Sequence, residues 1–304
     1  MAFGVGDCST IPHLRFNFVL ISGIWLGVSK PYMNTMMKPF AEKLKALRVN
    51  GIQWVHSRTK EVHTSYVSVC SFCVDAPVRA QLQNILSHGG RHFCHACEQK
   101  MKKLPPQQVV PGEKKKRRRR VYTFEEEPAE LRTVHRMQEQ GKEARRKAVD
   151  GAKVQPEKGV KGPSVISDIP DWDRSTAVFP EYMHLCLIKE FMTLWFENAG
   201  PWSLQEHRDN IDNFLKNTRV PDFITRIPRS TEHFTNWKAN EFRSFLLFFS
   251  VIIILSQCMK PKYFQHWLLL VSAFNLLLQD SVHQNDVMRA NILLRMFCRN
   301  FTTL

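Results

Sequence analysis

The sequence predicts an α/β N-terminal part that carries a zinc knuckle, followed by a mostly helical C-terminal region. A run rich in β-branched and aromatic residues, 61–69, lies between two segments of helical periodicity and indicates a strand. Two Cys-x-x-Cys pairs of the kind that bind zinc follow it along the chain. Residues 163–304 then place apolar residues at helical spacing in segment after segment, which indicates helices.

Size and composition set the first limits. The chain has 304 residues, of which 43% are hydrophobic, and this is enough for one large or two ordinary domains with buried cores. Its 21 phenylalanines and modest 13 glycines favour helix-rich packing. Eight cysteines are too few for a disulfide scaffold in a chain of this length, so we expect a reducing compartment.

The two most apolar runs are residues 16–28 and 245–255, and both are shorter than the roughly 18 to 20 residues that span a bilayer. The first run also lacks the basic start and the small-residue cleavage site of a signal peptide. We interpret both runs as buried helices and expect no membrane insertion.

The first elements in order are a helix, a break and a second helix within residues 11–55. The first helix ends near Pro31, and the second covers residues 33–47 and is closed by Gly51. The apolar face of this second helix is expected to contain Met36, Phe40, Leu44 and Leu47.

The strand over residues 61–69 ends at the first cysteine pair. Pro77 then lies where a helix can begin, and Gly89 and Gly90 lie where it can end. The apolar face of this helix is expected to contain Val78, Leu82, Ile85 and Leu86.

Composition changes sharply at residue 102. Apolar residues become sparse, and seven like charges follow one another in the sequence KKKRRRR. We therefore expect residues 102–162 to form a basic insertion that is largely disordered or peripheral, with a mixed-charge stretch up to Lys147 that could form a solvated helix.

The apolar pattern of the C-terminal region, residues 163–304, predicts a series of helices. Segment 179–196 repeats apolar residues on one side, and a short helix begins at residue 211. Three longer helices are expected over residues 236–255, 262–279 and 286–297.

The two cysteine pairs lie within residues 70–97, in the sequence CSFCVDAPVRAQLQNILSHGGRHFCHAC. Two residues between cysteines allow both thiolates to reach one ion from a tight turn, and two such turns complete a tetrahedral sulfur shell. The predicted zinc ligands are Cys70, Cys73, Cys94 and Cys97. The alternative is a set of reduced, partly buried thiols that pack as small hydrophobic side chains.

Two acidic residues are candidates for phosphoryl-transfer chemistry. Asp75 is the only carboxylate between Glu61 and Glu98 and follows the predicted strand, where a magnesium ligand could lie. Its alternative role is to cap the helix that starts at Pro77. Glu241 begins a very apolar helix, where it could face an active cleft or simply complement the helix dipole.

Charge favours a polyanionic partner. The net charge is +15 and the isoelectric point is near 9.6, with nucleic acid as the first candidate and an acidic membrane surface as the second. The basic cluster is typical of a nuclear-import signal or of a phosphate contact, the alternative being a solvated run without a partner. It consists of Lys114, Lys115, Lys116, Arg117, Arg118, Arg119 and Arg120.

Taken in order, several motifs resemble the transposases of CACTA (En/Spm-like) DNA transposons and the proteins derived from them. They are RFNFVLISGIWLGVSKPYMNTMMKPF, CSFCVDAPVRA, CHAC, GVKGPS, FPEYMHLCLIKEFMTLWF, RIPRSTEHFTNWKANEFRSFLLFFS and YFQHWLLLVSAFNLLLQDSV. The similarity covers roughly residues 11–100 and 160–300.

This resemblance implies an RNase H-like core that uses three acids and two magnesium ions. It implies that residues 1–101 are a partial core of this type with the zinc knuckle inserted. Asp75 then matches the second acid and Glu241 the third, while Glu181 replaces the aspartate that usually precedes Tyr-Met-His. The first acid has no match, because Asp7 lies in no strand-like run.

The function expected from the resemblance is that of a truncated, transposase-derived nuclear protein that binds DNA through its phosphates and is catalytically incomplete. A second hypothesis keeps metal-dependent DNA cleavage and strand transfer, with a partner that supplies the missing acid and with magnesium as cofactor. A third is a zinc-dependent protein-interaction module. The expected partners are DNA and a nuclear-import receptor.

Overall fold

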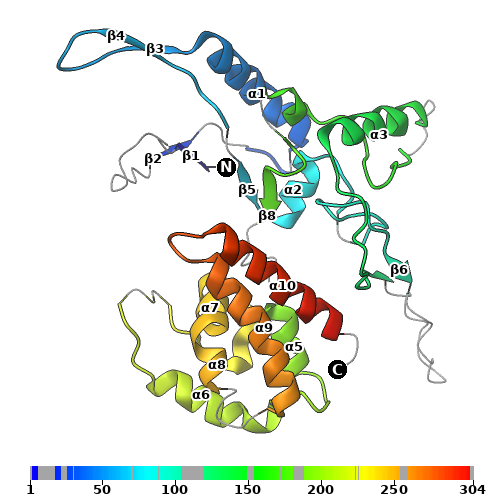
Figure 1. The fold of residues 1–304 in the computed structure, drawn as a ribbon, viewed down its shortest axis with the longest axis vertical. Coiled ribbons are helices and arrows are strands. Elements are labelled where there is room, and N and C mark those ends of the chain that lie inside the picture. The colour runs from blue at the N-terminus through cyan, green and yellow to red at the C-terminus, as the bar shows by residue number, and fades with distance from the viewer. Residues whose placement is uncertain are drawn as a thin grey trace. The chain divides into compact units, whose positions relative to one another are not determined.

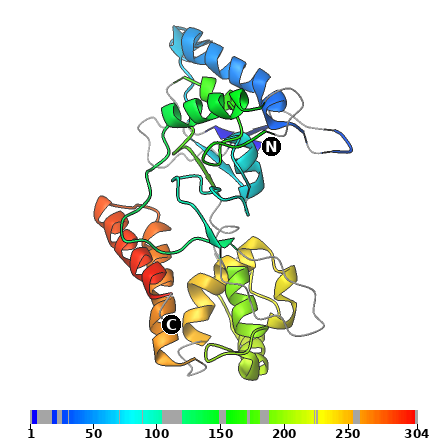
Figure 2. The same cartoon turned by 90° about the vertical axis from the view of Figure 1, so that its right-hand side faces the viewer.

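The computed structural model describes residues 2–5, 18–21, 26–29, 31–69, 71–87, 89–103, 120–148, 154–170, 173–180, 188–222, 224, 226–253 and 259–301. The chain forms two compact units (Figures 1 and 2). Unit 1 contains Met1–Val121 and Ala129–Phe179, and unit 2 contains Tyr122–Pro128 and Pro180–Leu304. Each unit has its own cluster of buried apolar side chains.

The long helix of unit 1 is α1, Met33–Asn50, and it confirms the helix predicted over residues 33–47. Gly51 ends it with a positive φ of 70°, and its N–H donates to the carbonyl of Leu47. The buried face is turned by one residue from the predicted one and contains Met33, Met37, Ala41 and Leu44, whereas Met36 and Phe40 are only partly buried.

A strand replaces the first predicted helix. β2, Phe18–Ile21, pairs antiparallel with β1, Ala2–Val5, so the helical interpretation of residues 16–28 is wrong for the part that the structure describes. The sequence of β2 is FVLI, and aromatic and β-branched residues favour extended backbone. A short apolar run does not by itself distinguish a strand from a helix.

A two-stranded ribbon follows α1. β3, Ile52–Val55, pairs antiparallel with β4, Val62–Ser65, which confirms a strand within residues 61–69. Figure 1 shows the ribbon extending away from the end of α1. All eight residues of the two strands are exposed.

The core of unit 1 forms where α1 meets the segment that carries the first cysteine pair. β5, Phe72–Val74, pairs with β8, Val178–Pro180, and leads directly into α2, Ala76–Leu82. The Phe72 N–H donates to the carbonyl of Ala177 at 2.8 Å. The cluster also contains residues of the short 3-10 helix η1, Val165–Asp168, which packs on α1.

Part of the expected insertion is built into unit 1. Helix α3, Val134–Arg146, buries Met137 and Ala144 completely, and Met137 packs with Ala80 and Ile85 from the region of α2. A small antiparallel pair also forms here, between β6, Lys102–Lys103, and β7, Arg120–Val121. This arrangement differs from the largely disordered or peripheral segment expected over residues 102–162.

Unit 2 is helical in its described part. Its principal helices are α5, Ile188–Phe196, α6, Arg208–Asn217, α9, Pro261–Leu277, and α10, Gln284–Asn300. Between α6 and α9 lie the 3-10 helix η3, Thr231–Asn236, then α7, Ala239–Ser244, the π-helical turn η4, Phe245–Phe249, and α8, Ser250–Ile253. A 3-10 turn, η2, Gln205–His207, precedes α6. The predicted helices at residues 211, 262–279 and 286–297 are confirmed.

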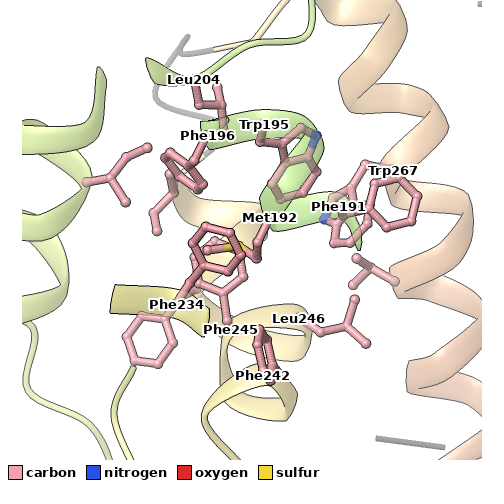
Figure 3. Close-up of a cluster of buried hydrophobic side chains, with 14 of the residues drawn as sticks. Phe191, Met192, Trp195, Phe196, Leu204, Phe234, Phe242, Phe245, Leu246 and Trp267 are labelled. Atoms are coloured by element: carbon pink, nitrogen blue, oxygen red, sulfur yellow. The ribbon is translucent and has the colours of Figure 1, made fainter. Parts of the chain in front are cut away.

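Aromatic side chains dominate the core of unit 2, as Figure 3 shows. The rings of Trp195 and Trp267 meet edge to face, with centroids 4.6 Å apart, and Phe191 packs on Trp267 at 4.9 Å. Most of the run at residues 245–253 is buried in this core, as predicted for a short apolar helix, although Ile252 is 52% exposed. In the described part of the chain, no helix is long and apolar enough to cross a membrane.

Candidate functional site

Asp75 lies between β5 and α2 and is exposed. Its Oδ1 accepts a hydrogen bond from the Val78 N–H at 2.8 Å, so the carboxylate caps the first turn of α2. The helix-cap interpretation is therefore confirmed, and the role of Asp75 as a magnesium ligand stays a prediction. The pair β5–α2 fixes its position, because buried Phe72 and Leu82 anchor the two elements in the core of unit 1.

The second cysteine pair brings two sulfur atoms close together. The Sγ atoms of Cys94 and Cys97 lie 3.4 Å apart. Two thiolates on one tetrahedral zinc, with Zn–S bonds of about 2.3 Å, lie about 3.8 Å apart. A hydrogen bond from the Cys97 thiol lowers the pKa of Cys94 to about 6 and raises that of Cys97. The lowered pKa of Cys94 favours its thiolate, which is the form of cysteine that binds metal.

The full tetrathiolate stays a prediction. Cys73 lies on β5 and is exposed, whereas Cys70 lies outside the described residues. Among the residues that the structure does describe, no three or more His, Cys, Asp or Glu side chains form a group that could hold a metal ion. Cys94 and Cys97 lie close together, and zinc at this pair also stays a prediction.

Arg132 holds the turn of the second cysteine pair in place. It is 3% exposed, and its guanidinium donates to the carbonyls of Cys94 at 2.9 Å, His92 at 3.2 Å and Lys158 at 2.8 Å. Backbone pairing adds to this, because the Arg132 N–H donates to the carbonyl of Ala96. An arginine from the expected insertion therefore organises the candidate zinc turn.

Glu98 forms a buried ionic network next to Cys97. Its side chain is 5% exposed and accepts hydrogen bonds from Arg136 at 2.9 Å, Lys158 at 2.8 Å and Gln140 at 2.6 Å. Burial opposes ionisation, but the bonds from Lys158 and Gln140 outweigh it and lower the pKa of Glu98. The network ties α3 to the cysteine turn.

Positive charge is buried around the same turn. Arg79 on α2 is 4% exposed and Arg174 is completely buried. Burial is the main reason that the pKa of His95 falls to about 4, and the charges of Arg79 and Arg132 lower it further. Within the described structure, none of the three guanidinium nitrogens of Arg174 has a hydrogen-bond acceptor, and burial lowers its pKa to about 10.

Glu241 is committed to an ion pair in unit 2. Its side chain is 3% exposed, and its two carboxylate oxygens accept from Arg229 Nε at 2.7 Å and from a terminal Arg229 nitrogen at 3.0 Å. The Lys238 N–H donates to the same carboxylate at 2.7 Å. Burial opposes ionisation, but these bonds outweigh it and lower the pKa of Glu241. The arrangement is a capping interaction at the start of α7.

The remaining predicted site residues divide as follows. Asp75 belongs to unit 1 and Glu241 to unit 2. Asp7, Glu181 and the basic residues 114–119 lie outside the described residues. Arg120, the last of the basic cluster, lies in β7, and its guanidinium donates to the carbonyl of Gly89 at 3.1 Å.

No motif marks Arg132, which the folded chain brings to the carbonyl of Cys94. Arg229 lies in the same motif as Glu241, but the motif does not indicate that the two side chains pair. No family model, curated protein or solved structure matches this chain.

Proposed function

We propose that this chain is a nuclear, transposase-derived DNA-binding protein that does not cleave DNA by itself. The ordered motifs that resemble CACTA transposases support the origin. The observation that carries the absence of cleavage is the ion pair of Glu241. Its carboxylate is buried, and both oxygens accept hydrogen bonds from Arg229. This carboxylate is already used to stabilise the fold.

Metal-dependent cleavage needs carboxylates that are free to coordinate two metal cations. To serve as such a ligand, Glu241 must give up two charge-assisted hydrogen bonds from Arg229. Asp75 must share its carboxylate with the Val78 N–H that it caps. These arrangements favour a structural role for both acids and support DNA binding without cleavage.

Exposed positive charge supports the DNA-binding part of the proposal. Residues 31–69 contain six lysines and arginines and two glutamates, a net charge of +4. Lys38, Lys43 and Lys45 are exposed on α1, and Lys60 is exposed at the end of the ribbon. Cations of this kind neutralise phosphates and release condensed counterions, whatever the base sequence.

Zinc and a nuclear-import receptor complete the proposal. The Cys94–Cys97 turn supports zinc as a structural ion, which Cys70 and Cys73 would complete, and magnesium would be needed only if the chain were catalytic. The KKKRRRR cluster supports import into the nucleus. Deletion of residues 114–120 should leave a fluorescently tagged chain in the cytoplasm, and unchanged nuclear localisation would remove this part of the proposal.

Salt titration tests the DNA-binding part. The full chain should bind a labelled duplex of random sequence, and a log–log plot of the binding constant against salt should fall with a slope of several units, about 0.9 for each neutralised phosphate. A second duplex of unrelated sequence should give nearly the same affinity. Absence of binding at low salt would contradict the proposal.

A further inference from the structure

The β3–β4 ribbon is an element with no core of its own. Trp54, Val55 and Val62 are 43%, 58% and 66% exposed, and all the other residues of both strands are exposed as well. An isolated two-stranded hairpin is at best marginally stable in water. Exposed apolar side chains on both faces of such an element, Trp54 on one and Val55 with Val62 on the other, indicate that a partner covers it.

One face of the ribbon is aromatic. Side chains alternate between faces, and Trp54 pairs with His63 across the strands, so Ile52 and Ser65 share their face. The rings of Trp54 and His63 stack with centroids 4.9 Å apart and an interplanar angle of 26°. The Trp54 Nε1–H donates to Ser65 Oγ at 2.9 Å, which holds the indole flat on this face.

The turn at the end of the ribbon is basic. Arg58 and Lys60 are exposed in the turn between the strands, and the Lys60 N–H donates to the carbonyl of His56. Glu61 is the only acid of the ribbon, and His63 Nε2 lies 3.8 Å from its carboxylate. The tip therefore presents two cations that are suited to phosphate.

Gly51 fixes the ribbon directly onto the basic helix α1. A Cβ at this position would lie 2.5 Å from Thr64 Cγ2 and 3.1 Å from the carbonyl oxygen of Ser65. Only glycine therefore allows α1 and the strands to approach so closely with a φ of 70°. Lys43 and Lys45 add exposed positive charge on α1.

We propose that the β3–β4 ribbon enters the major groove of double-stranded DNA, with Arg58 and Lys60 on phosphates and the Trp54 face against the base edges. The proposal rests on the DNA-binding function above and names the element that performs it. Two strands about 4.8 Å apart, with their side chains, fit a groove about 12 Å wide. The indole supplies the apolar contact that a thymine methyl group can accept. The basic tip favours DNA over a second protein chain as the occupant.

The test compares three variants of the full chain by fluorescence anisotropy on labelled duplex DNA over a range of salt. The double variant Arg58→Ala, Lys60→Ala should bind about tenfold more weakly at 0.1 M salt and lose about 1.8 from the salt slope, because each phosphate contact contributes about 0.9. Trp54→Ala should weaken binding about tenfold with an unchanged slope, because the indole carries no charge. The control Lys216→Ala, Arg219→Ala removes the same charge from exposed positions of unit 2 and should leave the slope unchanged.

The outcomes separate the two proposals. If the parent binds and the ribbon variant keeps the parental slope, the ribbon inference is wrong and the DNA-binding function stands. If the parent binds no DNA, both are wrong. Preferential binding of single strands that Trp54→Ala abolishes, or self-association of the chain that this variant abolishes, would also overturn the major-groove assignment.

Discussion

At the scale of single residues, the side chains that the sequence indicates as candidates for catalysis or metal binding make structural interactions in the fold. Asp75 caps α2, Glu241 neutralises Arg229, and Cys94 and Cys97 share a hydrogen bond. A partner inside the first turn of a helix, such as the Val78 N–H on Asp75, follows from the local pattern, whereas Arg229 reaches Glu241 from 12 residues away, across η3. This is the reason that the cap of Asp75 could be anticipated and the arginine on Glu241 could not.

The acid dependence of stability tests the ion pair of Glu241. A carboxylate whose folded pKa is lowered stabilises the fold above its unfolded pKa of about 4.5, and this contribution is lost as the pH falls through the folded value. Glu241→Gln should reduce the free energy of unfolding by about 1.5 to 3 kcal/mol at pH 7. Urea unfolding at pH 7 and pH 3 should show the gap between parent and variant shrinking at low pH.

The exposed Glu232 supplies the matched control for this measurement. Glu232→Gln removes the same charge from η3 and should change stability by less than about 0.5 kcal/mol at either pH. A gap for Glu241→Gln that stays constant down to pH 3 would contradict the ion pair.

Among the described residues, Arg174 is completely buried and its guanidinium has no hydrogen-bond acceptor, although Asp168 and Asp173 attract its charge. Because burial of a cation without hydrogen-bond acceptors is costly, Arg174→Met should raise the free energy of unfolding by about 1 to 3 kcal/mol. The exposed Arg145→Met should change it by less than about 0.5 kcal/mol. Clear destabilisation by Arg174→Met in urea titrations would show that the guanidinium has an acceptor in solution.

At the scale of elements, long helices could be predicted and short apolar segments could not. Helices α9 and α10 follow from sustained periodicity. β2 contains four residues, and its strand character depends on pairing with β1. Helix α3 was predicted only as a solvated possibility, because burial of Met137 and Ala144 depends on partners in α2 and around Val160. The π-helical turn η4 also carries no sequence signal of its own.

The turn that contains Cys94 and Cys97 is the element that tests the zinc prediction. Changing both residues to serine should remove bound zinc from the purified chain, because thiolates supply the ligands and serine does not. Elemental analysis of protein purified in the presence of zinc gives the stoichiometry. Cys298→Ser is the control, because Cys298 lies on α10 in unit 2 and is not a predicted ligand.

A zinc content that is the same in the parent and in the Cys94→Ser, Cys97→Ser variant would contradict the site. Loss of zinc in this variant together with retained zinc in Cys298→Ser would support it. Single changes of Cys70 and Cys73 to serine extend the same measurement to the predicted first pair.

At the scale of the whole molecule, the sequence predicts its charge and its helical C-terminal region more readily than its domain boundaries. The two units divide near Phe179, but Tyr122–Pro128 belongs to unit 2, where Glu126 pairs with Arg299 of α10 at 2.6 Å. Such an exchange of a short segment depends on contacts between residues about 170 positions apart. Composition alone placed this segment in a peripheral insertion.

The central claim is that this molecule binds DNA and leaves it intact. One gel measures both DNA binding and DNA cleavage. Supercoiled plasmid is incubated with saturating full-length chain and magnesium, and samples are run before and after protease digestion. The account predicts retarded plasmid before digestion and fully supercoiled plasmid afterwards. Nicked or linear plasmid after digestion that disappears in Asp75→Asn would contradict it and restore the catalytic alternative.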